Sequence, residues 1–186
     1  MSPSGGASTR PCLHERRSEE RPHLVSDDPR RLRPDHHPTP FSAAEIRDAF
    51  EVGREVRSLT VRAGAEPYVL VRRNLSADHE AGIYEVWTES TDGVRLSEPE
   101  QGRSTWLELQ GHASMPADAT TIDTVEIDLP MGRYQGLRYT RVTGDAVDTF
   151  WFALSLPGAP VRMESRVDGQ VVLSWTTIAL RRPPSG

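Results

Sequence analysis

Residues 148–175 read DTFWFALSLPGAPVRMESRVDGQVVLSW, and this stretch decides the fold. An aromatic run over residues 150–152 is followed by Pro157-Gly158 and then by residues 161–167, in which every second side chain is charged. Such alternation is typical of a strand with one buried face. Asp168-Gly169 is a tight hairpin turn into a last strand. Strands joined by turns this short pair antiparallel, because a parallel crossover needs a dozen or more residues.

The same pattern extends toward the N-terminus. Residues 125–129 alternate between apolar and acidic side chains, and turn residues follow them and recur near residue 144. Further upstream, apolar residues recur with a period of two in four segments: residues 56–61, 68–71, 83–87 and 94–96. We therefore predict a mainly β (α+β) domain, in which an antiparallel sheet of seven to nine strands is accompanied by one or two short helices.

A capping box predicts the first helix. Ser42 precedes Glu45 by three residues, so the serine hydroxyl can accept the Glu45 amide while the carboxylate accepts the Ser42 amide. Ile46 and Phe50 then fall on one face at helical spacing. We expect a short helix from residue 43 to about residue 51.

Residues 104–115 fit either of two elements. Thr105 and Glu108 form a second capping box, and Trp106 and Leu109 lie on one helical face. Two leucines spaced two positions apart also fit the alternation of a strand. We favour the helix and keep the strand as the alternative.

The C-terminal part of the sequence resembles a known family. From residue 125 to residue 180 the order is an alternating strand, Pro-x-Gly, a strand ending in Arg-Tyr-Thr, an aromatic strand, Leu-Pro-Gly-x-Pro-Val-Arg, an Asp-Gly hairpin and a last strand. This order is similar to the C-terminal part of bacterial lipoprotein-carrier (LolA/LolB-like) domains and of families related to them. The resemblance implies a strongly curved antiparallel sheet wrapped around one or two helices, with an apolar inner surface. Members of that family carry acyl chains or lipoproteins outside the cytoplasm.

Composition divides the chain at residue 40. Residues 1–40 contain no Trp, Tyr, Phe or Ile and are rich in Pro, Ser, Gly, Arg and Glu, so we expect a disordered tail. Residues 41–182 form the predicted single domain.

The longest apolar run in the tail is Leu24-Val25, which is too short for a secretory signal, and no stretch reaches the roughly 18 apolar residues of a membrane helix. We expect a cytoplasmic protein without a membrane span.

Charge and cysteine content exclude several classes of function. The net charge is -5, and all 22 basic residues are Arg. Acids outnumber Arg after residue 40, which argues against nucleic-acid binding, because contacts with a phosphate backbone are largely cationic. The absence of Lys excludes Schiff-base and Lys-nucleophile mechanisms. The single cysteine, Cys12, cannot form an internal disulfide.

Few side chains form a pattern typical of catalysis or metal binding. Two clusters place His beside acids, but each consists of adjacent residues in the tail or in a turn: Asp35-His36-His37 and Asp78-His79-Glu80. His112 lies one helical turn after Glu108, and the nearby hydroxyl groups of Ser104 and Ser114 lie outside any nucleophile-elbow motif. We therefore predict no catalytic residues, no metal, no cofactor and no enzymatic activity.

Aromatic residues are the strongest signal for a binding site. Trp87, Trp151 and Trp175 fall in predicted strands, and Trp106 falls in the segment that fits two elements. Together with Tyr139 they are the candidate ligand-binding residues, on the hypothesis that some of them line a cavity between the curved sheet and the helices. The alternative is that these large side chains fill the core.

Two functions therefore remain open. The first is a small binding module that holds an apolar or amphipathic small molecule on a concave sheet. The second is a protein–protein interaction or scaffold domain with a filled core, in which Phe41, Trp87 and Trp106 occupy the space under the sheet. A cavity lined by aromatic residues favours the first function, and a filled core with a bare strand edge favours the second.

Overall fold

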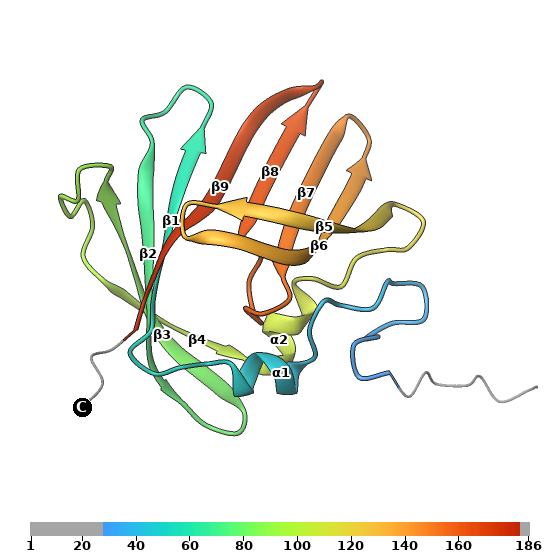
Figure 1. Ribbon diagram of the computed structural model, residues 1–186, viewed down its shortest axis with the longest axis horizontal. Coiled ribbons are helices and arrows are strands. Elements are labelled where there is room, and N and C mark those ends of the chain that lie inside the picture. Colours follow the sequence, from blue (N-terminus) through green and yellow to red (C-terminus); the bar gives the residue numbers. More distant parts are fainter. Residues whose placement is uncertain (1–27, 183–186) are drawn as a thin grey trace, which may run out of the picture.

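The computed structural model describes residues 28–182 of the chain. Two helices and nine strands follow one another along it (Figure 1): α1 (Ala43–Asp48), β1 (Glu55–Arg62), β2 (Tyr68–Ala77), β3 (Ala81–Ser90), β4 (Glu100–Thr105), α2 (Trp106–Gly111), β5 (Thr120–Leu129), β6 (Gly132–Thr143), β7 (Ala146–Ala153), β8 (Arg162–Val167) and β9 (Gln170–Arg181).

One antiparallel sheet contains all nine strands, in the order β4-β3-β2-β1-β9-β8-β7-β6-β5. The chain builds this sheet as two meanders, β1 to β4 and β5 to β9, and the first strand of one pairs with the last strand of the other. Opposite Arg57 and Ser58 of β1, strand β9 carries one extra residue, Ile178, which makes a β-bulge. The free edges are β4 and β5, so the sheet is curled but open (Figure 1). Nine strands and two helices confirm the predicted mainly β fold.

Both helices begin at the predicted capping boxes. The side chains of Ser42 and Glu45 cap α1, and those of Thr105 and Glu108 cap α2 in the same reciprocal way. The second helix is shorter than the predicted segment, because the residues before Trp106 pair with β3 as strand β4. The helices lie side by side at one end of the curled sheet, which we call the helical end (Figure 1). Within residues 28–182, no helix is long and apolar enough to cross a membrane.

Residues 28–41, which we call the N-terminal segment, pack against the helical end. Gln110 of α2 is 2% exposed, and its amide donates to the Thr39 hydroxyl at 3.0 Å and to a backbone carbonyl of the segment at 2.8 Å. The Tyr139 hydroxyl donates to the Pro38 carbonyl at 2.9 Å. These contacts make the segment part of the domain.

Residues 28–40 fall in the tail that the sequence predicts to be disordered, and the structure describes their contacts with the domain, whereas residues 1–27 lie outside the described part of the chain. Hydrogen bonds to backbone carbonyls and the ion pair between Arg30 and Glu45 hold this stretch in place. A boundary drawn from apolar content overlooks such polar contacts.

The largest apolar cluster joins the helices to β6 and β7. The ring centroid of Phe152 lies 6.4 Å from that of Phe41 and 5.3 Å from that of Tyr139, both in edge-to-face geometry. Trp106 of α2 contacts Phe50 in the same way at 5.2 Å. Each such pair contributes about 0.5–1.5 kcal/mol beyond the area it buries. The cluster therefore fixes both helices against the sheet.

Trp87 lies on the outer face of the sheet, away from the helices. Gly82 in the same strand faces Trp106, and alternation along β3 turns Trp87 to the opposite side. There it packs beside Val71, and two arginine guanidinium groups lie 5.0 and 4.9 Å from its ring centroid. Its indole N–H donates to the Glu89 carboxylate at 2.7 Å. Trp87 therefore belongs to a separate outer cluster.

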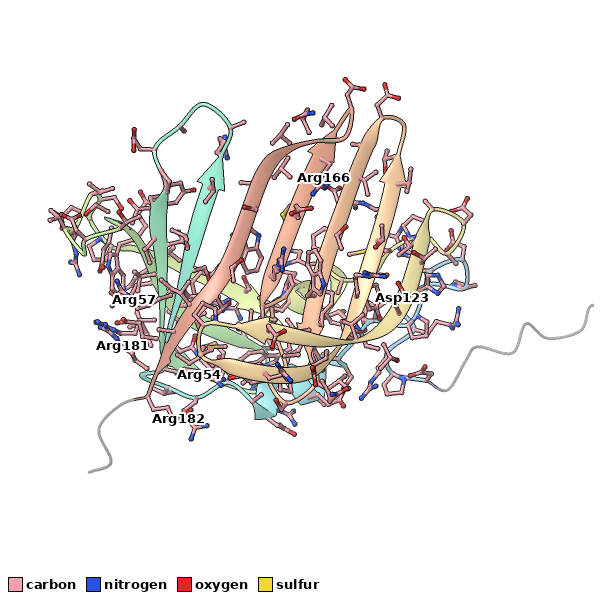
Figure 2. The ribbon with its side chains drawn as sticks, turned by 45° about the horizontal axis from the view of Figure 1, so that its top comes forward. Arg54, Arg57, Asp123, Arg166, Arg181 and Arg182 are labelled. Atoms are coloured by element: carbon pink, nitrogen blue, oxygen red, sulfur yellow. The ribbon has the colours of Figure 1, made fainter. Side chains whose placement is uncertain are left out.

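An ionic network lies on the outer face next to Trp87. The Glu55 carboxylate is 3.2 Å from Arg57 and 3.6 Å from Arg181, and Arg57 also donates to Glu89. Figure 2 shows Arg57 and Arg181 beside β1 and β2. Both carboxylates are buried. The hydrogen bond from Arg57, followed by that from Trp87, lowers the pKa of Glu89.

Gly136 of β6 leaves room for the Ile127 side chain of the neighbouring strand β5. A Cβ atom at this position would overlap Ile127 of β5 and the carbonyl oxygen of Phe152. The φ angle of Gly136 is not positive, so the constraint is space and not backbone conformation. Ile127 is buried in a cluster with Leu129 and Ala153. The missing side chain thus makes room for a core residue.

We predict that Gly136→Ala lowers the free energy of unfolding by about 1–3 kcal/mol, because the added methyl group overpacks a closed site. Gly111→Ala is the matched control, since a Cβ at that position at the end of α2 would meet nothing within 4 Å apart from its chain neighbours and the backbone of its own helix. We expect that variant to be neutral or slightly more stable. Urea unfolding measures both, and equal stabilities of the two variants would contradict the packing described for β6.

Acid sensitivity should reveal the outer ionic network. The lowered pKa of Glu89 means that its contribution to stability is complete above about pH 4.3, the ordinary value for an unfolded glutamate, and is lost as the pH falls through the lower folded value. Glu89→Gln should therefore be about 1–3 kcal/mol less stable than the wild type at pH 7, with the difference shrinking toward pH 3. Urea unfolding across this pH range is the measurement.

Glu66→Gln is the control for acid unfolding, because Glu66 is exposed and forms no hydrogen bond or ion pair within residues 28–182. Its stability should follow the wild-type curve at every pH. A deficit of Glu89→Gln that stays the same between pH 7 and pH 3 would show that the charge of Glu89 adds nothing.

Candidate ligand-binding cavity

A cavity of about 580 Å³ lies between the inner face of the sheet and the two helices. Strands β1, β2 and β9, helices α1 and α2, and the loop of residues 154–161 between β7 and β8 supply most of its wall. Pockets for small molecules measure roughly 300–1,000 Å³. The domain therefore contains a space of the size of a small-molecule site.

Short polar side chains form the part of the wall on β1 and β9. Ser58 and Thr60 point inward at alternate positions of β1, and Ser58 pairs with Thr177 of β9. Within residues 28–182, none of these three hydroxyl groups makes a hydrogen bond. Leucine or phenylalanine at these positions would extend into the space. The cavity therefore exists because the centre of the inner face carries small residues.

Apolar side chains supply much of the remaining wall. Strand β7 contributes Phe150 and Phe152, helix α2 contributes Leu109, and strand β9 contributes Leu173 and Trp175. Removing apolar ligand surface from water against such side chains is favourable by about 25 cal/mol per Å². This part of the wall suits a hydrocarbon chain or ring.

Arginine supplies the permanent charge on the wall. Arg54, Arg62 and Arg72 line the cavity together with His112, and no Asp or Glu is among the lining residues of the described chain. Figure 2 shows Arg54 near the helical end of the strands. The protein as a whole has a net charge of -5, so the cavity is opposite in sign to the rest of the molecule.

Arg72 projects from β2 into the cavity and stacks on Tyr84, with its guanidinium carbon 4.0 Å from the ring centroid. The Tyr84 ring covers Gly102 of β4, where a Cβ would overlap it, and the Tyr84 hydroxyl lies 3.2 Å from Ser104 Oγ. Within residues 28–182, the Arg72 side chain forms no ion pair and no hydrogen bond, and its Nε is buried without a partner. Burial lowers the pKa of this guanidinium.

Of the five aromatic residues predicted to bind a ligand, Trp175 lines the cavity. The structure places the other four elsewhere. Trp87 lies on the outer face, and Trp151 lies on the side of β7 opposite to the cavity. Trp106 and Tyr139 are buried in the aromatic cluster at the helical end, where burial raises the pKa of Tyr139 to about 12. The structure therefore does not bring the five together.

The adjacent histidines of the N-terminal segment make structural contacts. His36 Nδ1 lies 2.8 Å from Ser114 Oγ, and His37 Nε2 lies 2.9 Å from the Thr120 carbonyl oxygen. The described part of the chain, residues 28–182, contains no group of three or more side chains that could hold a metal ion. Both imidazoles thus attach the segment to the domain.

His112 lines the cavity without its expected partner. The Glu108 carboxylate accepts the Thr105 amide in the capping box of α2, and no hydrogen bond or ion pair joins it to His112 in the part of the chain described. Ser114 bonds to His36 and Ser104 to Tyr84. The structure therefore assembles no Ser–His–carboxylate arrangement from these residues.

Sequence reasoning missed Arg72, although one signal pointed to it. Alternation along β2 puts Tyr68, Leu70 and Arg72 on the same face, and an arginine that continues an apolar face is unusual. Arg54 carried no such signal, because it precedes β1. The small residues of β1 gave no signal in the sequence either, since whether they leave a cavity depends on the residues that they face across the sheet.

Two buried threonines should differ in their contribution to stability. Thr39 is 2% exposed and its hydroxyl bonds to the Arg30 carbonyl at 2.9 Å and to Gln110 at 3.0 Å, whereas Thr177 is 3% exposed and its hydroxyl has no partner within residues 28–182. We predict that Thr39→Val costs about 1–3 kcal/mol and that Thr177→Val changes stability by less than about 0.5 kcal/mol. Urea unfolding of both variants is the measurement. Equal losses of stability in the two variants would contradict the finding that the Thr177 hydroxyl at the cavity has no hydrogen-bond partner within residues 28–182.

Comparison with known proteins gives a likeness in fold. Neither a protein-family model nor a curated protein matches the chain. Among solved structures, it is similar to the crystal structure of MucB in complex with MucA(peri), at 14% identity and a TM-score of 0.50 over 74% of this chain and 55% of that chain. MucB alone gives 12% identity and a TM-score of 0.50 over 76% of this chain and 57% of that chain. The chain thus spans little more than half the length of MucB, whose fold is lipoprotein-carrier-like, and the predicted resemblance holds at the level of the fold.

Proposed function

We propose that this protein is a binding module that holds an apolar or amphipathic small molecule between its curled sheet and its two helices. The observation that carries the proposal is the unfilled space of about 580 Å³ beside well-packed apolar clusters. A concave space of this size next to a well-packed core is the usual setting of a small-molecule site.

The composition of the wall supports a ligand with both apolar and polar parts. Phe150, Leu109 and Trp175 offer apolar contact, while Ser58 and Thr60 offer hydroxyl groups that make no hydrogen bond within residues 28–182. A cavity lined mainly by apolar side chains with a few convergent polar groups is the usual composition of a small-molecule site. Both parts of the wall are thus available to one bound molecule.

A second candidate function is a protein-interaction module. Strands β4 and β5 are the free edges of the sheet in the described chain, and an extended peptide can add to such an edge. MucB, which shares the fold, has been crystallised in complex with MucA(peri). This function needs no cavity. Binding of small amphiphiles to the purified protein therefore distinguishes the two candidate functions.

Titration with dodecanoate and with dodecanol, followed by tryptophan fluorescence, tests the proposal. We expect a saturable blue shift at micromolar ligand, because a bound chain displaces water from Trp175, the Trp on the cavity wall. Trp175→Phe should remove most of that shift, whereas Trp151→Phe should keep it. Saturation by neither ligand would contradict the proposal and favour the interaction module.

Filling the cavity should also weaken binding. Ser58→Leu adds a bulky side chain on the cavity wall, and we expect calorimetry to show at least about a tenfold loss of affinity for both ligands, since the added atoms occupy their space. Ser76→Leu is the matched control, because Ser76 is exposed in β2 and away from the cavity. Unchanged affinity in Ser58→Leu would place binding elsewhere on the protein.

A further inference from the structure

We infer that the ligand carries an anionic head group, a carboxylate or a phosphate, and that Arg72 binds this head group inside the cavity. The inference rests on the proposed function, because it specifies the class of ligand that the same cavity takes. It starts from one observation: a partly buried arginine on the wall has no acceptor within residues 28–182.

Two arginines of restricted exposure elsewhere in the sheet are neutralised by acids. Arg57 contacts Glu55 and Glu89 on the outer face, and Arg141 is 2.7 Å from Asp148. Arg141 also has an unbonded Nε, yet its charge is paired. Arg72 has neither a paired charge nor a satisfied Nε. A buried cation without a counter-charge is unfavourable, so the charge of Arg72 calls for a bound anion.

Contacts with Tyr84 restrain the guanidinium of Arg72 in the orientation in which it can donate to an acceptor. Its stacking on Tyr84 at 4.0 Å restrains the side chain, and Tyr84 itself is restrained by its close contact with Gly102 and its bond to Ser104. Stacking uses the flat face of a guanidinium and leaves the N–H groups at its edge free. These N–H groups form a planar fork that matches two oxygens of a carboxylate or a phosphate.

Arg54 adds a second positive charge near the same place. Its neighbour Glu55 is opposite Arg73 in the sheet, and the Arg54 carbonyl accepts the Asn74 amide at 3.0 Å, so Arg54, just before β1, is a diagonal neighbour of Arg72 on β2. The Nε of Arg54 is buried without a partner. With no acid among the described residues that line the cavity, the two arginines create a positive potential that an anionic head group would neutralise.

The register of the sheet gives the ligand a direction. Arg72 pairs with Val56 near the helical end, while Thr60 pairs with Trp175 further along β1. A head group at Arg72 therefore leaves its chain running along β1 and β9 toward Trp175. The path passes the short side chains of Ser58 and Thr60, which leave room for a chain, and ends beside the apolar side chains of Trp175 and Leu173.

A ligand series with one chain length and different head groups tests the inference on the full-length protein. Calorimetry is run with dodecanoate, dodecyl phosphate, dodecanol and dodecyltrimethylammonium at pH 8, with acetate and inorganic phosphate as head groups without a chain. We expect the two anionic amphiphiles to bind about tenfold or more tightly than dodecanol, and the cationic one to bind more weakly than dodecanol. The chainless anions should bind too weakly to compete, which separates a lipid head group from a free anion.

Substitution of the arginine provides the second readout. Arg72→Gln should weaken dodecanoate binding by about tenfold or more and leave dodecanol binding nearly unchanged. Arg166→Gln, at the other end of the sheet and away from the cavity, is the control and should match the wild type (Figure 2). Circular dichroism checks that the variants fold, and the wild-type ligand series decides the question should Arg72→Gln fail to do so.

The outcomes separate the two levels of the proposal. Equal binding of dodecanol and dodecanoate to the wild type would overturn the assignment of an anionic head group and leave the binding module standing. A loss of dodecanol and dodecanoate binding by the same factor in Arg72→Gln would likewise overturn it, since Arg72 would then act through packing alone. Binding of no amphiphile at all would overturn the proposed function itself, and with it the inference.

Discussion

The pairing of β1 with β9 is the interaction on which the rest of the structure depends. Without it, the chain would form two separate antiparallel meanders, each with one more open edge. The bulge at Ile178 lies in this pair, and β1 and β9 together supply Ser58, Thr60 and Thr177 to the cavity. The seam that joins the meanders is therefore also the part of the inner face where small residues leave room.

The two faces of the sheet differ in whether a buried arginine is paired with an acid. Arg57 and Val71 are partners on adjacent strands, and the next residue of β2 is Arg72, so two arginines lie close together on opposite faces. On the outer face, Arg57 is neutralised by Glu55 and Glu89. On the inner face, the Arg72 guanidinium lies over the Tyr84 ring and has no ion pair within residues 28–182. Paired charge consolidates the outer face, and unpaired charge gives the cavity its polarity.

Local signals in the sequence predicted the fold well. Both capping boxes start helices, and short turns such as Asp168-Gly169 produced the antiparallel order, because each of these features depends on residues close together in the chain. The cavity was harder to predict, since Ser58 and Thr60 matter only through the residues that they face across the sheet.

The aromatic residues show the same limit. Periodicity placed Trp87 and Trp175 in strands, yet the side of the sheet on which each lies depends on how the two meanders join. The N-terminal segment escaped prediction for another reason. Its attachment comes from hydrogen bonds between distant residues, such as Gln110 with Thr39, which composition does not reveal.

The seam between β1 and β9 also has a kinetic consequence. It pairs residue 55 with residue 181, so these strands come together only when the chain between them has been made and brought into place. Contacts between residues so far apart raise the contact order, and domains rich in such contacts fold in milliseconds to seconds. Until the seam forms, the two meanders expose strand edges that can pair with other chains. The contact that creates the cavity is thus among the last that the folding chain can make.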